Sequence, residues 1–341
     1  MLSKRDSTFI KGLAVLLLLF HHNPLGNNSL TVFRSSARVL VWLFFFVSAY
    51  GFSLQLEKGQ GRHPIRFVTK RILLLLLPMW LIYPINLAAQ IINAPGLILN
   101  YFSESWVRLP LDIFSLSHFF GLSGVSGYWY VGMLMVVIVL FPLIDLVVKK
   151  TGWLSIPLAY VFILVEPVRL LSCRGGYFDE YLMIVVLGSL FARKKVFEHI
   201  PSLPKQLKYV LMVFSIFLIL ALACVRFELK DLVSESRFFY ADPITTMLAL
   251  AIVLWVFLFR MDNAASSVLE WLGAQSGNIY YIHSIFYNIL LFKFPINDRF
   301  LSYFLCLGFS LSISFLIESV KKRTDYDSRL RSGIKKLLKE T

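Results

Sequence analysis

Lys11 and His22 are the residues whose types and spacing point most directly to chemistry. They lie eleven positions apart in the first apolar stretch of the chain. Because an α-helix turns by about 100° per residue, the two side chains differ by only roughly 20° around the axis and share one face. A rise of about 1.5 Å per residue separates them by roughly 16 Å along the axis. We therefore expect Lys11 at the cytoplasmic boundary of a membrane and His22 beyond the middle of the membrane.

The imidazole is the reactive half of this pair. A histidine with a pKa of about 6.5 can take a proton from a hydroxyl and return one to a leaving group. The pair suits a substrate whose anionic end stays at a membrane surface while its reactive end reaches inward, as in acyl-coenzyme A. His21 lies about 80° from the shared face, and a kink before Pro24 would decide which histidine faces the substrate. The alternative is that both histidines only form interhelical hydrogen bonds.

A second set of candidates is a basic loop that contains Arg66, Lys70 and Arg71. Guanidinium forks match the oxygens of a phosphate, and lysine adds a point charge. These residues are therefore candidate ligands for the phosphates of such a substrate. They also fit a simpler interpretation, in which they only keep the loop on the cytoplasmic side of a membrane.

The remaining candidates each have a structural alternative. Trp129 belongs to an aromatic triplet that either stacks on a sugar or lies in an interfacial belt. His283 either reacts or holds helices together. Arg34 and Arg38 either receive an anionic acceptor or anchor a helix end. We find no glycine-rich phosphate loop, HExxH, G-x-S-x-G or Cys/His metal pattern, and we predict no metal site.

The composition indicates that these candidates lie in a membrane. Apolar and aromatic residues make up 57% of the 341 residues, charged residues 16%, and the mean hydropathy is +0.71. A soluble domain has roughly 45–50% apolar and about 25% charged residues, so this chain has too little polar surface to fold in water. A net charge of +14 would indicate nucleic acid in a soluble protein. Here Lys and Arg cluster in alternate connections, which is a topology signal, and we expect no nucleic-acid partner.

We predict an all-α membrane protein with about ten transmembrane helices and both termini in the cytoplasm. The expected spans are 8–30, 37–56, 72–92, 128–148, 153–171, 181–192, 207–225, 239–259, 276–292 and 300–320. The first span is expected to be retained, because no small-residue cleavage site follows it. An eleventh span at 109–122 would reverse the sides of all later basic clusters, and the charge pattern argues against it.

The simplest organisation is one membrane domain, residues 1–322, followed by a basic cytoplasmic tail, residues 323–341. The longest connection, residues 93–127, is expected to lie outside and to contain a short helix at the membrane surface. We find no internal repeat and no inverted symmetry of the kind many transporters have. The three cysteines have no metal spacing and are interpreted as apolar filler.

Several segments, taken in order, resemble the acyltransferase-3 family of integral membrane acyltransferases. The opening helix of that family carries a basic residue, usually Arg, and a His after ten further residues, which corresponds here to Lys11 and His22. The other similar segments are Phe44-Phe45-Phe46-Val47-Ser48-Ala49-Tyr50-Gly51, Lys70-Arg71 through Pro78, Gly127-Tyr128-Trp129-Tyr130 and Asn278-Ile279-Tyr280-Tyr281-Ile282-His283. The chain departs from the family pattern with Lys11 for Arg, Ala49 for Gly and Leu74 for a basic residue.

The resemblance implies a ten-helix enzyme that transfers an acyl group, most often acetyl from cytoplasmic acetyl-CoA, to a hydroxyl of a cell-envelope or extracellular polysaccharide or its lipid-linked precursor. His22 is then the catalytic residue. No cofactor is bound permanently, because acyl-CoA is a donor substrate. The residues expected to bind the coenzyme are Lys11, Arg66, Lys70 and Arg71. The candidates for substrate binding are His21, Trp129, His283, Arg34 and Arg38.

Two other classes of function stay open at this point: a transporter or flippase that moves a lipid-linked sugar without acyl chemistry, and a membrane subunit of a glycan-assembly complex. The enzyme's expected partners are acyl-CoA, a glycan or lipid-linked glycan, and the bilayer of the cytoplasmic (inner) membrane. A protein partner would be glycan-assembly machinery or a second copy of the chain. Direct transfer and an acyl-enzyme intermediate both fit the residues.

Overall fold

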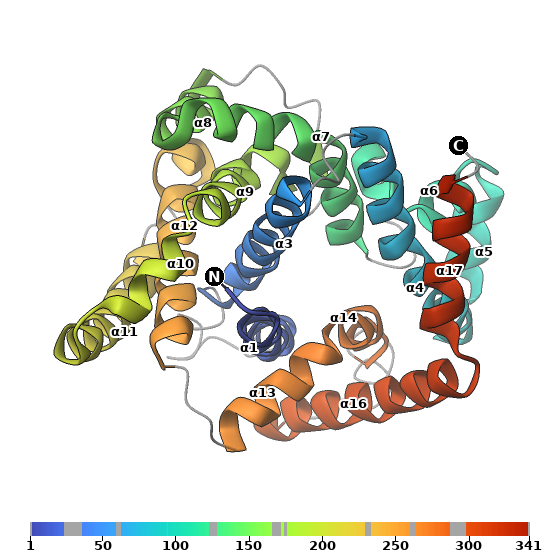
Figure 1. Cartoon of the computed structure of the whole chain (residues 1–341). Helices are drawn as coiled ribbons and strands as arrows, with labels where there is room; N and C mark the ends of the chain where they lie inside the picture. The colour runs from blue at the N-terminus through green and yellow to red at the C-terminus, as the bar shows by residue number, and fades with distance from the viewer. Residues whose placement is uncertain are drawn as a thin grey trace. The chain divides into compact units, whose positions relative to one another are not determined.

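Helices make up nearly all of the described chain, which confirms the predicted all-α membrane fold (Figure 1). The computed structural model describes residues 2–23, 36–58, 63–93, 95–122, 128–165, 172–173, 176–228, 233–259, 264–286 and 298–339. Extended backbone in these residues is limited to two strands of two residues each, β1 (Ser172–Cys173) and β2 (Gly176–Tyr177).

The chain divides into two compact units, which are described one at a time. The first comprises Met1–Lys58, Leu140–Leu171 and Gly176–Ser276, and the second comprises Gly59–Val139, Ser172–Gly175 and Gly277–Thr341. The helices of the first unit are α1 (Lys4–His22), α3 (Leu40–Glu57), α8 (Ser155–Val165), α9 (Phe178–Arg193), α10 (Val196–His199), α11 (Lys205–Glu228), α12 (Val233–Phe259) and α13 (Ala264–Ala274). Those of the second are α4 (Pro64–Asn93), α5 (Pro95–Ser103), α6 (Arg108–Ile113), α14 (Ser276–Ile285), α16 (Arg299–Arg323) and α17 (Tyr326–Lys339). The long helix α7 (Trp129–Thr151) has residues in both units, and short 3₁₀ turns are η1 (Ala37–Val39), η3 (Ser117–Phe120), η4 (Gly152–Leu154) and η6 (Ile200–Ser202).

Helix α1 begins at a capping box. The Ser3 hydroxyl accepts a hydrogen bond from the Asp6 backbone N–H at 3.1 Å, and the Asp6 carboxylate accepts one from the Ser3 N–H at 2.8 Å. Two backbone donors that lack an intrahelical partner are thereby satisfied. The helix ends after His22, where the N–H of Asn23 bonds to the Leu19 carbonyl at 3.1 Å.

Helices α3 and α9 form the core of the first unit through a close aromatic contact. The ring of Tyr181 packs against Trp42 at 4.8 Å and against Phe45 at 4.7 Å between centroids. Gly188 of α9 faces the backbone of α3, since a Cβ there would lie 2.7 Å from the Phe46 carbonyl oxygen. The aromatic run of the family-like segment is thus buried in the α3–α9 interface.

Helix α4 begins earlier than the sequence predicted. The basic residues expected in a loop before residue 72 instead form the first two turns of α4, which begins at Pro64. Proline is favoured at the first position of a helix, because its missing N–H needs no partner there. The 30 residues of α4 span about 45 Å at about 1.5 Å per residue, which is more than the thickness of the roughly 30 Å hydrocarbon core. A helix of this length crosses the apolar layer at a tilt or extends beyond it.

The predicted short helix in the long connection is present, as α5 and α6. This connection is fastened to α4 by polar contacts. The Trp80 indole donates to the Ile113 carbonyl at 2.8 Å, and the Tyr83 hydroxyl donates to the buried Asp112 carboxylate at 2.9 Å. Trp106, by contrast, is 83% exposed, as an interfacial aromatic residue would be.

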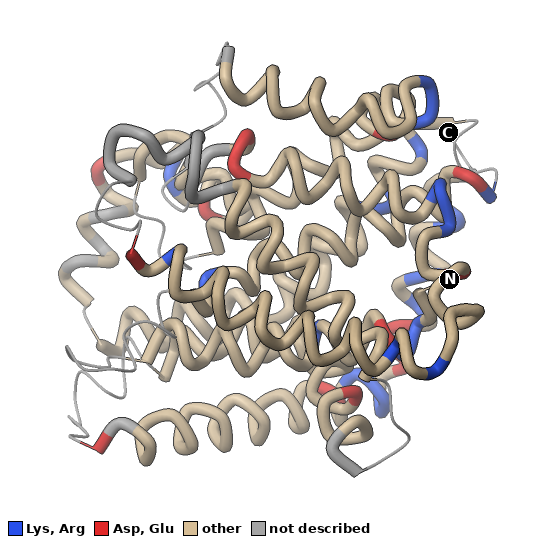
Figure 2. The backbone as a smooth tube through the Cα atoms, turned by 90° about the vertical axis from the view of Figure 1, so that its left-hand side faces the viewer, with Lys and Arg blue, Asp and Glu red and all other residues tan. Residues whose placement is uncertain are grey.

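Five stretches of the described chain are long and apolar enough to cross a membrane, and they identify a multi-pass membrane protein. They are Ala37–Glu57, Pro64–Asn93, Trp129–Leu164, Lys205–Glu228 and Phe300–Arg323, and Pro243–Phe259 is a shorter apolar helix. Phe214 and Phe217 of α11 are 58% and 66% exposed, which suits contact with lipid rather than water. Figure 2 shows long uncharged stretches of helix, with Lys and Arg mainly near helix ends. The number of spans and the side of each terminus stay predictions.

Candidate active site

Helix α1 carries the Lys11 and His22 pair without interruption. The common face inferred from their spacing therefore exists in the folded helix. Lys11 is half-buried and His22 is exposed at the last turn. The pair thus has a cation near the middle of the helix and an accessible imidazole at its end.

The two histidines differ in their surroundings. His21 is half-buried, whereas His22 is exposed, and their rings meet edge to face with centroids 5.2 Å apart. A general base must reach the proton that it removes. Exposure favours His22 over His21 for this task, and the residues that follow, 24–35, lie outside the described chain.

Close packing against α13 holds α1 in place. A Cβ on Gly12 would lie 1.9 Å from the Leu269 carbonyl oxygen, and a Cβ on Gly273 would lie 1.7 Å from the Thr8 carbonyl oxygen. Only glycine permits backbones to approach so closely. The N-terminal half of the helix that carries His22 is therefore fixed by two glycines.

The basic candidates of α4 belong to the second unit. Arg66 is exposed, while Lys70 and Arg71 are half-buried. The Arg71 guanidinium lies over the ring of Phe67, 5.8 Å from its centroid, and Phe67 is itself buried. Arg66 and Lys70 are one turn apart on α4, so the helix presents adjacent cations that could bind phosphate oxygens.

A buried polar cluster joins α4 and α14 to Tyr128, the residue that precedes α7, within the second unit. Asn86 donates from its side-chain nitrogen to the Tyr128 hydroxyl at 2.8 Å, and that hydroxyl donates to the Tyr281 carbonyl at 3.1 Å. Asn86 was not predicted from the sequence. An amide in the middle of an apolar span is costly unless it is paired, and that cost is the signal that could have found it.

Trp129 and His283 belong to the edge of this cluster. Trp129, the first residue of α7, packs edge to face against Tyr130, with centroids 6.3 Å apart. Tyr130 packs against Tyr280 at 5.4 Å, and Tyr280 lies 5.9 Å from the His283 ring. The Nδ1 atom of His283 lies 2.7 Å from the Tyr280 carbonyl oxygen, and the side chain is buried. The contact between Tyr130 and Tyr280 thus joins the two segments that carry Trp129 and His283, which lie far apart in the sequence.

Arg38 forms an ion pair across the first unit. Its guanidinium nitrogen lies 3.5 Å from the Glu180 carboxylate, which is fully buried. This contact fits the anchoring interpretation of Arg38. The other arginine of that pair, Arg34, lies outside the described residues.

Asp145 is a further polar centre that sequence reasoning missed. Its Oδ1 atom accepts hydrogen bonds from Ser53 at 2.7 Å, Ser189 at 2.8 Å and the Nε of Arg193 at 2.9 Å. Arg193 also bonds to the second carboxylate oxygen. These residues come from α3, α7 and α9, so the cluster ties three helices of the first unit together. A lone carboxylate in the apolar run of α7 was the signal available in the sequence.

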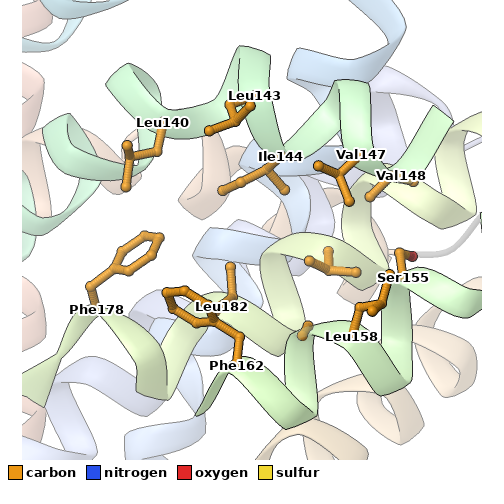
Figure 3. Close-up of a pocket in the computed structure, with 12 residues that line it drawn as sticks. Leu140, Leu143, Ile144, Val147, Val148, Ser155, Leu158, Phe162, Phe178 and Leu182 are labelled. Carbon is orange, nitrogen blue, oxygen red and sulfur yellow. The ribbon is translucent and has the colours of Figure 1, made fainter. Parts of the chain in front are cut away.

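An apolar cavity of about 360 Å³ lies between α7, α8 and α9 (Figure 3). Leu143 and Val147 line it from α7, Phe162 from α8, and Leu182 from α9. Its lining contains no titratable side chain, so it offers no group for proton transfer. Among the described residues, no three His, Cys, Asp or Glu side chains gather as metal ligands.

A family model described as an acyltransferase domain matches residues 6–319, which is nearly the whole chain. The protein belongs to the acyltransferase-3 family. It is a membrane protein with an acyltransferase domain, as the sequence pattern predicted. Comparisons with curated proteins and with solved structures gave no match.

Two departures of this acyltransferase from the family pattern have a structural setting. Ala49, where the family prefers Gly, lies on α3 against Gly188, and its Cβ would be 2.9 Å from a Cβ at that position. The methyl group of Ala49 is thus accommodated by a glycine on the facing helix. Leu74, where the family has a base, is half-buried in α4, so the basic face of this acyltransferase ends one turn earlier.

Proposed function

We propose that the protein is an O-acyltransferase of the cytoplasmic membrane, which moves an acetyl group from acetyl-CoA to a hydroxyl of a cell-envelope or extracellular polysaccharide or its lipid-linked precursor. The observation that carries the proposal is the acyltransferase match over residues 6–319 in a chain whose α1 carries an exposed His22. The family match supports acyl transfer as the class of reaction. The histidine supplies a side chain that can take up and release the proton which this reaction moves.

The proposed reaction needs a base near the glycan hydroxyl that receives the acetyl group. The hydroxyl oxygen attacks the thioester carbonyl, a C–O bond forms, and the C–S bond breaks. His22 takes the hydroxyl proton and returns it to the leaving thiolate, so that an ester and free coenzyme A are the products. General base catalysis of this kind contributes about 10²- to 10⁴-fold to a rate.

The donor is proposed to bind through its phosphates at the cytoplasmic side. Arg66, Lys70 and Arg71 offer the charge-assisted hydrogen bonds that phosphates accept. Lys11 of α1 is a further candidate for binding the donor. The extended coenzyme can keep its phosphates at such cations while its thioester reaches inward.

The acceptor is proposed to use the aromatic and polar residues at the other side of the protein. The segments that carry Trp129 and His283 are in contact through Tyr130 and Tyr280. Aromatic rings can stack on sugars, which supports this surface as the acceptor side.

The test is acetyl transfer from labelled acetyl-CoA to native cell-envelope glycan in membranes that contain the wild type, His22→Ala or His21→Ala. We expect label in the glycan and release of free coenzyme A with the wild type. His22→Ala should lower the rate at least 10²-fold, whereas the neighbouring His21→Ala should keep most of it. Amounts of inserted protein are matched by immunoblot.

Two outcomes would contradict the proposal. Full transfer by His22→Ala would remove this residue from catalysis. The absence of both label and coenzyme release with the wild type, with native glycan present, would overturn acetyl-CoA as the donor.

A further inference from the structure

The C-terminal helix α17 is amphipathic and basic, and the reaction proposed above gives it no role. Its apolar side is buried, with Ile334 and Leu338 only 5% and 8% exposed. Arg331 and Lys335 are exposed. They are one turn apart, so they lie on the same flank of the helix.

Helix α17 is docked on α4 rather than free in solution. The Tyr326 hydroxyl donates a hydrogen bond to the Leu77 carbonyl at 3.0 Å. A tyrosine is protonated at neutral pH, and burial raises the pKa of this phenol further, so the hydroxyl is a donor there. In Figure 1, α17 (red) lies beside α4 (blue), and the two helices belong to the same unit.

The docking brings cations of the two helices together. The ammonium of Lys70 is repelled by Arg71, by Lys335 and by Arg66. Lys335 is separated from Lys70 by most of the chain, and the return of α17 along α4 places them close enough for their charges to interact.

A group of like positive charges is unfavourable unless an anion binds between them. The repulsion costs free energy in the empty protein, and an anion with several oxygens converts it into attraction. Guanidinium and ammonium groups from two helices match the several oxygens of a phosphate group.

We propose that α17 completes a phosphate-binding site, in which Arg331 and Lys335 join Arg66 and Lys70 to bind the phosphates of the nucleotide part of the acyl donor. This inference rests on the proposed function, because it takes acyl-CoA as the donor. The tail is then part of the donor site, and not only an anchor on the cytoplasmic side. The same cations could instead meet phosphates of lipid headgroups, and the experiment separates these two sources.

The experiment measures KM for acetyl-CoA and for 3′-dephospho-acetyl-CoA with the full-length protein in nanodiscs of phosphatidylcholine alone. The variants are Lys335→Ala, Arg331→Ala and the control Arg329→Ala. Arg329 is also exposed and basic, but lies roughly 120° around α17 from Lys335. We expect the first two to raise KM for acetyl-CoA about three- to tenfold with little change in kcat, and the control to leave KM unchanged.

A second readout does not depend on turnover. Adenosine 3′,5′-bisphosphate binding to the same nanodiscs should weaken by a similar factor in Lys335→Ala, and the wild-type affinity should fall as salt is raised. If Lys335 contacts the 3′-phosphate, its effect on KM should shrink for the dephospho donor. An effect of equal size on both donors would place Lys335 at the diphosphate instead, within the same proposed site.

The failures of the two proposals are distinguishable. A wild type that transfers acetyl groups, together with Lys335→Ala and Arg331→Ala variants whose KM and bisphosphate affinity are unchanged, would overturn the role of α17 alone. Effects seen only when phosphatidylglycerol is added to the nanodiscs would assign these cations to lipid headgroups and would also overturn it. A wild type that releases no coenzyme A but still binds the bisphosphate through Lys335 would overturn the proposed reaction and keep the site.

Discussion

At the residue scale, Asp145 is a tightly bonded polar group that the sequence did not predict. Its carboxylate accepts hydrogen bonds from two serines and from Arg193, and it is 3% exposed. A buried carboxylate without such donors would be strongly destabilised. The four residues therefore form one unit of stability that links α3, α7 and α9.

We predict that Asp145→Asn lowers the stability of the detergent-solubilised protein by about 1.5–3 kcal/mol, because hydrogen bonds to a charged acceptor are replaced by weaker ones. Thermal unfolding followed by circular dichroism measures the change. Asp327→Asn, at an exposed position of α17, is the matched control and should unfold like the wild type.

The double variant Asp145→Leu/Arg193→Met sharpens this test. It leaves no unpaired charge, so it should be more stable than Asp145→Leu alone. Equal stability of the single and double variants would show that the ion pair does not carry the effect.

At the scale of elements, the position of α1 depends on two glycines. Gly12 and Gly273 let α1 and α13 approach until backbone atoms touch. Arg5 of α1 also forms an ion pair with Glu270 of α13. Because α1 carries His22, the packing of this helix pair should influence both stability and catalysis.

We predict that Gly12→Ala and Gly273→Ala each destabilise the protein by about 1–3 kcal/mol, as overpacked core substitutions do, and also lower acetyl transfer. The control is Gly308→Ala in α16, where a Cβ would meet nothing within 4 Å. That variant should be neutral or stabilised, because Ala is the better helix former. Thermal unfolding and the transfer assay together report both effects, and equal behaviour of Gly12→Ala and Gly308→Ala would disprove the role of the close contact.

At the scale of the whole molecule, the alternation of basic clusters predicts which side of the membrane each segment faces. The long connection with α5 and α6 is expected outside, where it exposes Trp106. The C-terminal helix α17 is expected inside, together with the N-terminus. The roles proposed for α17 and for Trp129 both depend on this topology.

Cysteine labelling of intact cells checks the topology. In a background in which Cys173, Cys224 and Cys306 are replaced by Ser, we expect Trp106→Cys to react with a membrane-impermeant maleimide added outside. Ser328→Cys, at an exposed position of α17, should react only after the cells are permeabilised. The reverse pattern would invert the proposed sides of donor and acceptor.

Part of this protein follows from local properties of its sequence. Length and hydrophobicity of the apolar runs determine that it is a helical membrane protein, because a bilayer requires every backbone group to be bonded within a segment. Lys11 and His22 share a face because helix geometry is local. The order of short motifs also sufficed to predict the family.

Other features depend on contacts between segments far apart in the chain, which the tertiary structure decided. The start of α4 at Pro64 had a local signal, proline at a first helical position, and so was within reach of sequence reasoning. The charge interaction between Lys335 and Lys70 had no such signal, and neither did the bond between Arg193 and Asp145. Hydrophobic periodicity specifies which face of a helix is buried but not which helix covers it. These partners are determined by how the helices pack in the tertiary structure. The proposed donor site depends on the same packing.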